Sequence, residues 1–318
     1  IVLEMVSDSP AGELLGETTR EYTFESCGET LDMAELQEIW ESKLEPVYPY
    51  RKAGPTVEKI NGKLNAPAAP KIGVAKPKVI IPVFPGTNCE YDTAKAFARA
   101  GADPEILVIR NLTPADVTAS CEALVKAIGE SQIVMLPGGF SGGDEPDGSA
   151  KFIASFFRSP AVTEAVRDLL QHRDGLMLGI CNGFQALIKL GLVPYGDIRP
   201  ITAYDPTLTF NTIGRHQSML VRTRVASTGS PGLSHCDAGS EYEIAISHGE
   251  GRFVAPQNVL DQLVANGQVA TQYVDLNGNP AMDINVNPNG SLEAIEGIFS
   301  PDGRVFGKMG HLERRGPY

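Results

Sequence analysis

The sequence has no hydrophobic run long enough to cross a lipid bilayer, which takes about 18 consecutive apolar residues. Its longest apolar runs, such as residues 79–84, are far shorter. Positive charge is also scarce, because 27 Lys and Arg residues face 39 Asp and Glu residues and give a formal net charge of −12. Such a chain repels polyanions, so we expect neither a nucleic acid nor a membrane as a partner.

Cysteine is sparse as well, and its spacing excludes two kinds of site. The 5 cysteines are odd in number and form no Cys-x-x-Cys pair. We therefore expect reduced thiols in a cytoplasmic protein, with no disulfide framework and no zinc knuckle. The chain begins without Met and without a basic segment ahead of an apolar one. We expect no signal peptide, and interpret the chain as a fragment of a longer protein.

Composition divides the chain into three zones. Residues 1–52 carry 12 acidic and 4 basic side chains. In this zone Tyr22 and Phe24 alternate with polar residues, as in a half-buried strand, and Asp32 with Glu35 resembles the capping box of a helix that contains Trp40. One strand and one helix cannot close a core, so we interpret 1–52 as the tail of a preceding domain. Residues 53–77 are rich in Ala, Pro, Gly and Lys, which predicts an extended linker.

From residue 78 to residue 318 the pattern alternates between short apolar runs and helical periodicity. The predicted strands are 79–84, 106–109, 133–136 and 176–180, and the predicted helices are 93–100, 115–128, 152–157, 162–170 and 184–190. This alternation predicts an α/β domain with a mostly parallel sheet and helices on both faces. After about residue 193 the chain becomes rich in strands and turns, with candidate strands at 219–225, 242–246, 270–274 and 295–299. Ligands of such sheets bind at the carboxyl ends of the strands.

Cys181 follows one of these strands and opens a helix, in the sequence Gly179-Ile180-Cys181-Asn182-Gly183. A residue on so sharp a turn is forced toward positive φ, and the flanking glycines give it room. The helix start also supplies free N–H groups and positive partial charge, which favour a thiolate. The pattern therefore favours a nucleophile over a buried structural cysteine, whereas Cys89, Cys121 and Cys236 are expected to be inert.

A nucleophilic cysteine needs a base, and the base needs an orienting group. His311 and Glu313 are two residues apart in an expected extended segment, so they can face the same target. Glu313 would fix the tautomer of His311, which would take and return a proton. Alternatively, the pair is a surface histidine with a solvated glutamate. The His-x-Glu pattern also begins a zinc deaminase signature, but no Pro-Cys-x-x-Cys follows, so we expect no metal.

A glycine-rich loop, Pro137-Gly138-Gly139-Phe140-Ser141-Gly142-Gly143-Asp144, comes directly after the third predicted strand. No Gly-Lys-Ser/Thr follows, which excludes a phosphate-binding loop. The loop suits an oxyanion hole built from the N–H groups of Gly139 and Asn182, although a plain tight turn is the simpler alternative.

These motifs, in this order, resemble those of class I (triad) glutamine amidotransferases. Over residues 78–318 the sequence also resembles the glutaminase domain of long-form phosphoribosylformylglycinamidine synthases. Three further motifs carry this resemblance: Asn-Cys-Glu-Tyr-Asp at 88–92, Ser-His-Gly-Glu-Gly-Arg at 247–252 and Asn-Pro-Asn-Gly-Ser at 287–291. The resemblance implies a flavodoxin-like sheet and assigns 1–52 to the end of the synthetase portion. One departure is that Leu312 stands between His311 and Glu313, where many relatives have proline.

The resemblance implies that Cys181 attacks glutamine, that a cysteinyl thioester forms as ammonia leaves, and that water activated by His311 releases glutamate. It also implies that Gly138, Gln185 and His248 contribute to the glutamine site. For Gln185 a polar residue on a helix face is an equal alternative, and for the His248 loop the alternatives are a docking role or a glycine turn. Arg222 and Arg224 have two interpretations, a surface for an acidic partner or a solvated strand edge.

The ammonia is expected to pass to an ATP-dependent synthetase domain that amidates formylglycinamide ribonucleotide in purine biosynthesis. That domain is absent from this chain, so ATP and Mg²⁺ are expected there and no cofactor is expected here. Two other functions remain open from the sequence: a different thiol hydrolase on the same fold, and a non-catalytic docking module.

Overall fold

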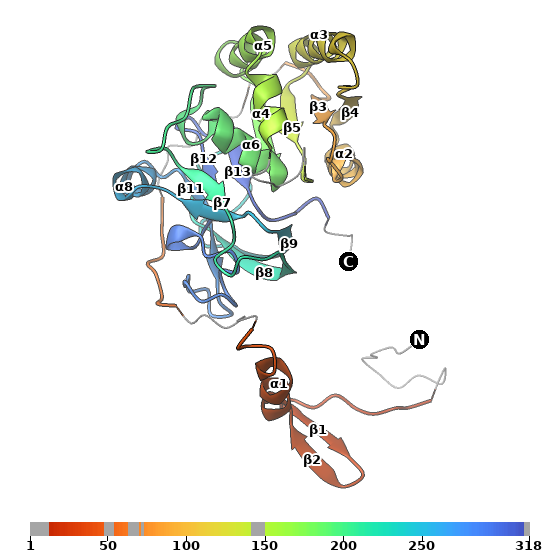
Figure 1. Cartoon of the computed structure of the whole chain (residues 1–318), viewed down its shortest axis with the longest axis vertical. Helices are drawn as coiled ribbons and strands as arrows, with labels where there is room; N and C mark the ends of the chain where they lie inside the picture. The colour runs from red at the N-terminus through yellow and green to blue at the C-terminus, as the bar shows by residue number, and fades with distance from the viewer. Residues whose placement is uncertain (1–12, 48–53, 63–69, 71–72, 141–149, 315–318) are drawn as a thin grey trace. The chain divides into compact units, whose positions relative to one another are not determined.

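The computed structural model describes residues 13–47, 54–62, 70, 73–140 and 150–314 of the chain. It divides into two compact units, Ile1–Tyr50 and Arg51–Tyr318, and each is described here by itself (Figure 1). Among the described residues, no helix is both long and apolar enough to cross a membrane.

The larger unit is built on one nine-stranded sheet with the order β4-β3-β5-β6-β13-β12-β11-β8-β9. The first five strands in this order are parallel neighbours: β4 (Asp103–Val108), β3 (Lys78–Val83), β5 (Ile133–Leu136), β6 (Leu176–Ile180) and β13 (Val305–Lys308). The others are antiparallel: β12 (Ile295–Phe299), β11 (Val269–Val274), β8 (Gln217–Val225) and β9 (Glu241–His248). A separate short pair joins β7 (Thr207–Thr209) to β10 (Arg252–Val254).

Helices follow most strands of the parallel half, as the alternating pattern predicted. They are α2 (Glu90–Arg99), α3 (Pro114–Glu130), α4 (Lys151–Phe157), α5 (Pro160–Gln171), α6 (Asn182–Leu190) and α7 (Leu192–Tyr195). A further helix, α8 (Gln257–Ala265), lies between β10 and β11. Short 3-10 turns lie at Pro231–Leu233 and Leu292–Ala294. Helices α3 and α5 lie side by side (Figure 1). The predicted α/β class is confirmed, whereas α8 falls in a region that we had interpreted as strands and turns.

The core lies between the sheet and the helices, because the central parallel strands β3, β5 and β6 are mostly apolar and buried. Val79, Ile80 and Ile81 of β3 are all 0% exposed, as is expected for a strand covered on both faces. Helix α6 approaches the sheet closely. A Cβ on Gly307 of β13 would lie 2.1 Å from a ring carbon of Phe184, so only glycine lets this helix pack there.

The smaller unit consists of a hairpin and one helix. β1 (Thr23–Ser26) pairs with β2 (Glu29–Asp32), and α1 (Met33–Ser42) follows directly. The predicted cap is confirmed, since Asp32 Oδ1 accepts from the N–H groups of Ala34 at 2.8 Å and Glu35 at 3.1 Å. The strand is not half-buried, because none of its residues is buried and α1 buries none either. A hairpin and one short helix have too little surface to enclose side chains.

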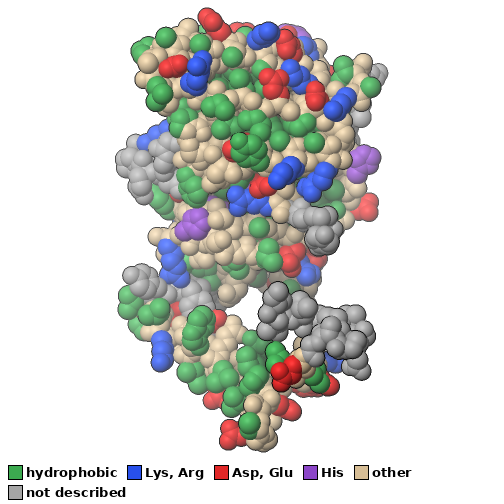
Figure 2. Space-filling view, turned by 90° about the vertical axis from the view of Figure 1, so that its right-hand side faces the viewer, with side chains coloured by type: hydrophobic (Ala, Val, Ile, Leu, Met, Phe, Trp, Pro, Cys, Tyr) green, Lys and Arg blue, Asp and Glu red, His purple; other side chains and the backbone are tan. Residues whose placement is uncertain are grey.

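Apolar side chains are therefore on the surface of this unit, next to acidic ones (Figure 2). Trp40, the sole tryptophan, is 78% exposed. We predict that the isolated, monomeric chain shows red-shifted tryptophan emission that acrylamide quenches almost as well as free tryptophan, because the indole is in water. A blue-shifted and quencher-protected emission would contradict this prediction, and sedimentation must first show that the sample is monomeric.

Residues 54–62, within the stretch expected to be a linker, lie against the larger unit. The N–H of Ile60 donates to Gln272 Oε1 at 2.9 Å, and Gln272 Nε2 donates to the carbonyl of Glu58 at 3.1 Å. Arg224 donates to the carbonyl of Ile60 at 2.9 Å and also bonds Asn61. Arg224 is thus neither a solvated edge nor part of a partner surface, and burial lowers its pKa. The boundaries 1–52, 53–77 and 78–318 stay a prediction, but part of the linker is bound.

Candidate active site

Cys181 occupies a strained turn between β6 and α6. Its φ is 52° and its ψ −106°, a conformation that residues other than glycine rarely adopt. Its N–H donates to the carbonyl of Lys308 at 2.8 Å, and the side chain is buried. A Cβ on Gly183 would lie 1.9 Å from the carbonyl oxygen of Leu136, so α6 begins against the end of β5. The turn thus places the thiol at the carboxyl ends of β5, β6 and β13, where the sequence predicted the site.

His311 and Glu313 lie at the same place. His311 Nδ1 is 2.5 Å from Glu313 Oε1, and both residues are buried. The His311 N–H donates to the carbonyl of Ala245 at 2.8 Å, which anchors the chain to β9. A Cβ built on Gly138 would be 2.6 Å from His311 Cε1 and 3.5 Å from Cys181 Cβ, so the ring and the cysteine flank the same glycine. The fold therefore brings together the three residues that the sequence singled out for chemistry.

The imidazole of His311 is held in its charged form. Burial lowers the pKa of His311, but hydrogen bonds to Cys181, Cys89 and Glu313 outweigh burial and raise the pKa from 6.5 to about 12. Because the pKa of His311 is higher in the folded protein than in the unfolded chain, protonated His311 stabilises the fold. This contribution to the free energy of unfolding is complete below pH 6.5 and is lost as the pH rises through about 12. At neutral pH the histidine is thus a proton donor beside the thiol.

Cys89 is also part of this cluster, although the sequence led us to expect an inert thiol. It is 1% exposed, and its Sγ lies 4.0 Å from His311 Nδ1. Arg314 Nη2 donates to the same sulfur at 3.0 Å. Cys89 precedes α2 and is 222 positions from His311, so no local pattern could reveal the contact. The expectation that Cys89 is inert stays a prediction, although the structure places its sulfur beside His311.

A metal ion is one alternative occupant of this cluster. The possible ligand atoms of Cys89, His311 and Glu313 lie within 4.8 Å of one another, as metal coordination would require. Two contacts disfavour an ion here. His311 Nδ1 is already bonded to Glu313, and the positive guanidinium of Arg314 lies against Cys89. A site without metal stays our prediction.

The glycine loop passes beside the nucleophile. Gly139 has a φ of 144°, and a Cβ there would lie 2.5 Å from the carbonyl of Gly86, so the position requires glycine. Within the described part of the chain, the backbone bonds of this loop leave the Gly139 N–H without an acceptor. A free N–H beside the thiol is what an oxyanion hole needs. The pairing of Gly139 with Asn182 stays a prediction, and residues 141–149 of the loop lie outside the described residues.

The loop that begins with Ser247 reaches the thiol, since the Ser247 carbonyl lies 4.0 Å from Cys181 Sγ. His248 is 2% exposed, and its Nε2 accepts from Asn289 Nδ2 at 3.2 Å. Burial and the nearby His311 and His216 lower the pKa of His248 to about 3, so this ring stays neutral. Its Nδ1 is buried and bonds no described side chain or backbone group. This placement supports a role for His248 in lining the site.

Gln185 links α6 to that loop. Its Nε2 donates to the carbonyl of Glu250 at 2.7 Å, and its Oε1 accepts from Asn182 Nδ2 at 3.0 Å. Both ends of the amide are thus bonded to protein. A contact between Gln185 and glutamine stays a prediction; the structure shows a side chain that fixes the loop.

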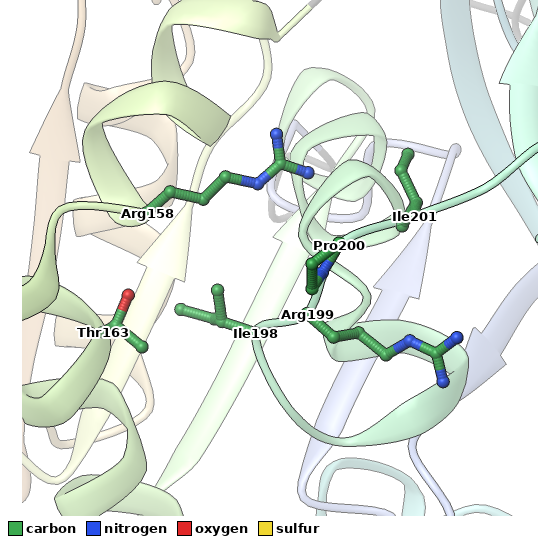
Figure 3. A pocket seen from close by; sticks show the side chains of 6 residues that line it. All are labelled: Arg158, Thr163, Ile198, Arg199, Pro200 and Ile201. Carbon is green, nitrogen blue, oxygen red and sulfur yellow. The ribbon is translucent and has the colours of Figure 1, made fainter.

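A surface pocket of about 440 Å³ lies apart from these residues (Figure 3). Its lining combines two arginines with apolar side chains: Arg158, Thr163, Ile198, Arg199, Pro200 and Ile201. Both cations are engaged elsewhere, because Arg158 donates to the carbonyl of Lys189 and Arg199 stacks over Tyr195 at 4.0 Å. The pocket includes no residue predicted for the site, so the Cys181 cluster remains the candidate active site.

Comparison with known proteins gives consistent matches to the larger unit. Residues 76–317 match the model of the CobB/CobQ-like glutamine amidotransferase domain. The phosphoribosylformylglycinamidine synthase subunit PurQ of Methanococcus maripaludis is 34% identical over 75% of this chain and 82% of its own length. PurQ of Symbiobacterium thermophilum is 37% identical over 73% of this chain and 85% of its own. Among solved structures, PurLQS from Thermotoga maritima matches with 27% identity and a TM-score of 0.53, covering 75% of this chain and 89% of that one.

Proposed function

Because the chain belongs to the family of CobB/CobQ-like glutamine amidotransferase domains, we propose that it is the glutaminase part of a phosphoribosylformylglycinamidine synthase. The observation that carries this proposal is the placement of Cys181 on a strained turn beside the buried His311–Glu313 pair. The PurQ relatives match the larger unit over most of their length, which supports the specific reaction as well as the general one.

The geometry suits a thioester mechanism. The Cys181 thiolate attacks the side-chain carboxamide carbon of glutamine, and the developing oxyanion lies against the N–H groups of Gly139 and Asn182. His311, which carries a proton at neutral pH, donates it to the leaving nitrogen, so that ammonia departs and the γ-glutamyl thioester remains.

The second half of the cycle uses the same histidine as a base. Once Cys181 is acylated it carries no negative charge, so one cause of the raised His311 pKa is removed. Neutral His311 then takes a proton from water, the hydroxide attacks the thioester, and glutamate leaves. Glu313 keeps the imidazole oriented through Nδ1 in both steps.

The ammonia serves a synthetase portion that amidates formylglycinamide ribonucleotide with ATP and Mg²⁺. This part of the proposal is supported by the PurLQS structure, which is similar to the larger unit, and by the PurQ names of the relatives. The extra unit at 1–50 lies outside the matched residues, and we assign it to the end of that synthetase portion. The reduced thiols of the site fit a cytoplasmic enzyme.

Glutamine labelled with ¹⁵N in the side-chain amide tests the proposal directly. We expect stoichiometric glutamate and ¹⁵N-ammonia, at a rate that rises when the synthetase portion is added. An electrophilic glutamine analogue should modify Cys181 first, as peptide mapping would show. Peptide hydrolysis without glutamine turnover would instead indicate another thiol hydrolase. No glutamate in the presence of the synthetase portion would indicate a docking module.

A further inference from the structure

Glu296 on β12 and Lys308 at the end of β13 form an ion pair in the interior of the larger unit. Lys308 Nζ is 3.2 Å from Glu296 Oε1, and the two side chains are 4% and 0% exposed. Removing two charges from water is costly, and apolar residues of the same size often give equal or higher stability. Stability alone therefore does not account for this pair.

Both charged groups bind the residue that precedes His311. Glu296 Oε1 accepts from the N–H of Gly310 at 2.6 Å, and Lys308 Nζ donates to the carbonyl of Gly310 at 3.1 Å. Glu296 also accepts the N–H of Met309 on its backbone carbonyl at 3.2 Å, and Thr271 donates to its other carboxylate oxygen. Three successive peptide groups before the imidazole, from the Met309 N–H to the Gly310 carbonyl, are thus fixed. Residues 309–313 contain no proline that would restrict the backbone covalently.

Lys308 contacts the nucleophile as well. Its backbone carbonyl accepts the N–H of Cys181 at 2.8 Å. Lys308 therefore binds the turn at Cys181 through its main chain and the segment before His311 through its side chain. Moving either side of this connection changes the distance between the thiol and the imidazole.

We propose that Glu296 and Lys308 are positioning residues for the glutaminase reaction, which set the place of His311 relative to Cys181. The inference rests on the proposed function. Misplacing a reacting group by about 1 Å can cost about 10²-fold in rate, even when the residue responsible never touches the substrate. A buried ion pair that is directional and short is suited to hold such a distance.

The test uses the full chain with Glu296→Met, Lys308→Met and the double variant. Each single variant leaves one buried charge unpaired and should melt at a lower temperature. The double variant should recover most of that loss while its kcat for glutamine stays about 10²-fold below wild type and its KM changes little. The control is the double variant Lys78→Met with Glu105→Met, which removes a surface pair of 2.7 Å and should keep the wild-type kcat.

A second readout does not require glutamine. The rate of Cys181 alkylation by iodoacetamide, followed by peptide mapping across pH, reports the thiolate that His311 stabilises. In the double variant alkylation should be slower than in wild type around neutral pH, because the imidazolium is no longer held in place beside the thiol. If the wild-type protein hydrolyses no glutamine, the proposed function is wrong. The alkylation profile then still tests whether Glu296 and Lys308 position His311 relative to Cys181.

Recovery of both stability and wild-type kcat in the double variant would overturn the positioning role, as would an unchanged alkylation profile. If the double variant does not fold, the Glu296→Gln variant tests the positioning role instead. This substitution keeps an acceptor for the Gly310 N–H but removes the charge that orients Lys308. We expect about a 10-fold loss of kcat in the folded Glu296→Gln protein. Wild-type kcat and an unchanged profile there would equally rule the role out.

Discussion

Replacing Cys181 by serine is expected to lower the kcat of glutamine hydrolysis by about 10⁴-fold or more. A hydroxyl gives up its proton far less readily than a thiol, so a serine at this position supplies very little of the anion that must attack glutamine. The smaller serine fits the buried turn, so the melting temperature should change little. Glutamate release and thermal unfolding, measured on the same samples, check both statements.

The matched control is Cys121→Ser. Cys121 is a partly buried cysteine on α3 whose Sγ lies 3.5 Å from Ser159 Oγ, at the N-terminal end of α5. Its loss should leave kcat within about twofold of wild type. A Cys181→Ser protein that kept a tenth of the wild-type rate would show that another group carries the reaction, and Cys89 would then be the first to replace.

Replacing His311 by glutamine is expected to lower kcat by about 10⁴-fold and to change how Cys181 alkylation depends on pH. In wild type the imidazolium persists far above its ordinary pKa of 6.5, so alkylation should remain fast through neutral and mildly acidic pH. Without the positive charge the thiol should react slowly below about pH 8 and faster above it, as an unassisted thiol does. Iodoacetamide kinetics at a series of pH values measure the difference.

His172→Gln is the control for this variant, because the His172 side chain is 72% exposed and its Nδ1 lies 3.5 Å from Asp168 Oδ1 at the end of α5. It should reproduce the wild-type kcat and alkylation profile. An alkylation profile of His311→Gln that coincided with wild type would show that His311 does not assist the Cys181 thiol.

The parts of the site that could be predicted are those encoded locally. Gly179 and Gly183 around Cys181 demand a tight turn between a strand and a helix, and the two-residue spacing of His311 and Glu313 lets them face the same way. These features depend on backbone geometry over a few residues. Likewise the central parallel strands β3, β5 and β6 were recognisable because they are mostly buried apolar runs. Asp103 and Glu105 instead hid the start of the edge strand β4, which was predicted only from residue 106.

The parts that could not be predicted depend on contacts between distant segments. Cys89 and Arg314 meet at 3.0 Å although 225 positions separate them, and nothing near Cys89 in the sequence indicates a basic partner. Nothing local in the sequence distinguishes Glu296 and Lys308 from solvated strand residues, because each has its charged partner on another strand. Helix α8 was missed because it lies between β10 and β11, in a part of the chain whose pattern is dominated by strands and turns.

Residues 54–62 also bear on where the catalytic unit physically starts. Sequence similarity to the family begins at residue 76, yet Gln272 and Arg224, which are 0% and 8% exposed, find bonding partners in chain that comes before it. A version trimmed to the similar region would leave an interior amide and a guanidinium open to invading water. Sequence similarity and hydrogen bonding thus give different starting residues for the larger unit. When this unit is expressed alone, the expressed chain should begin no later than residue 54.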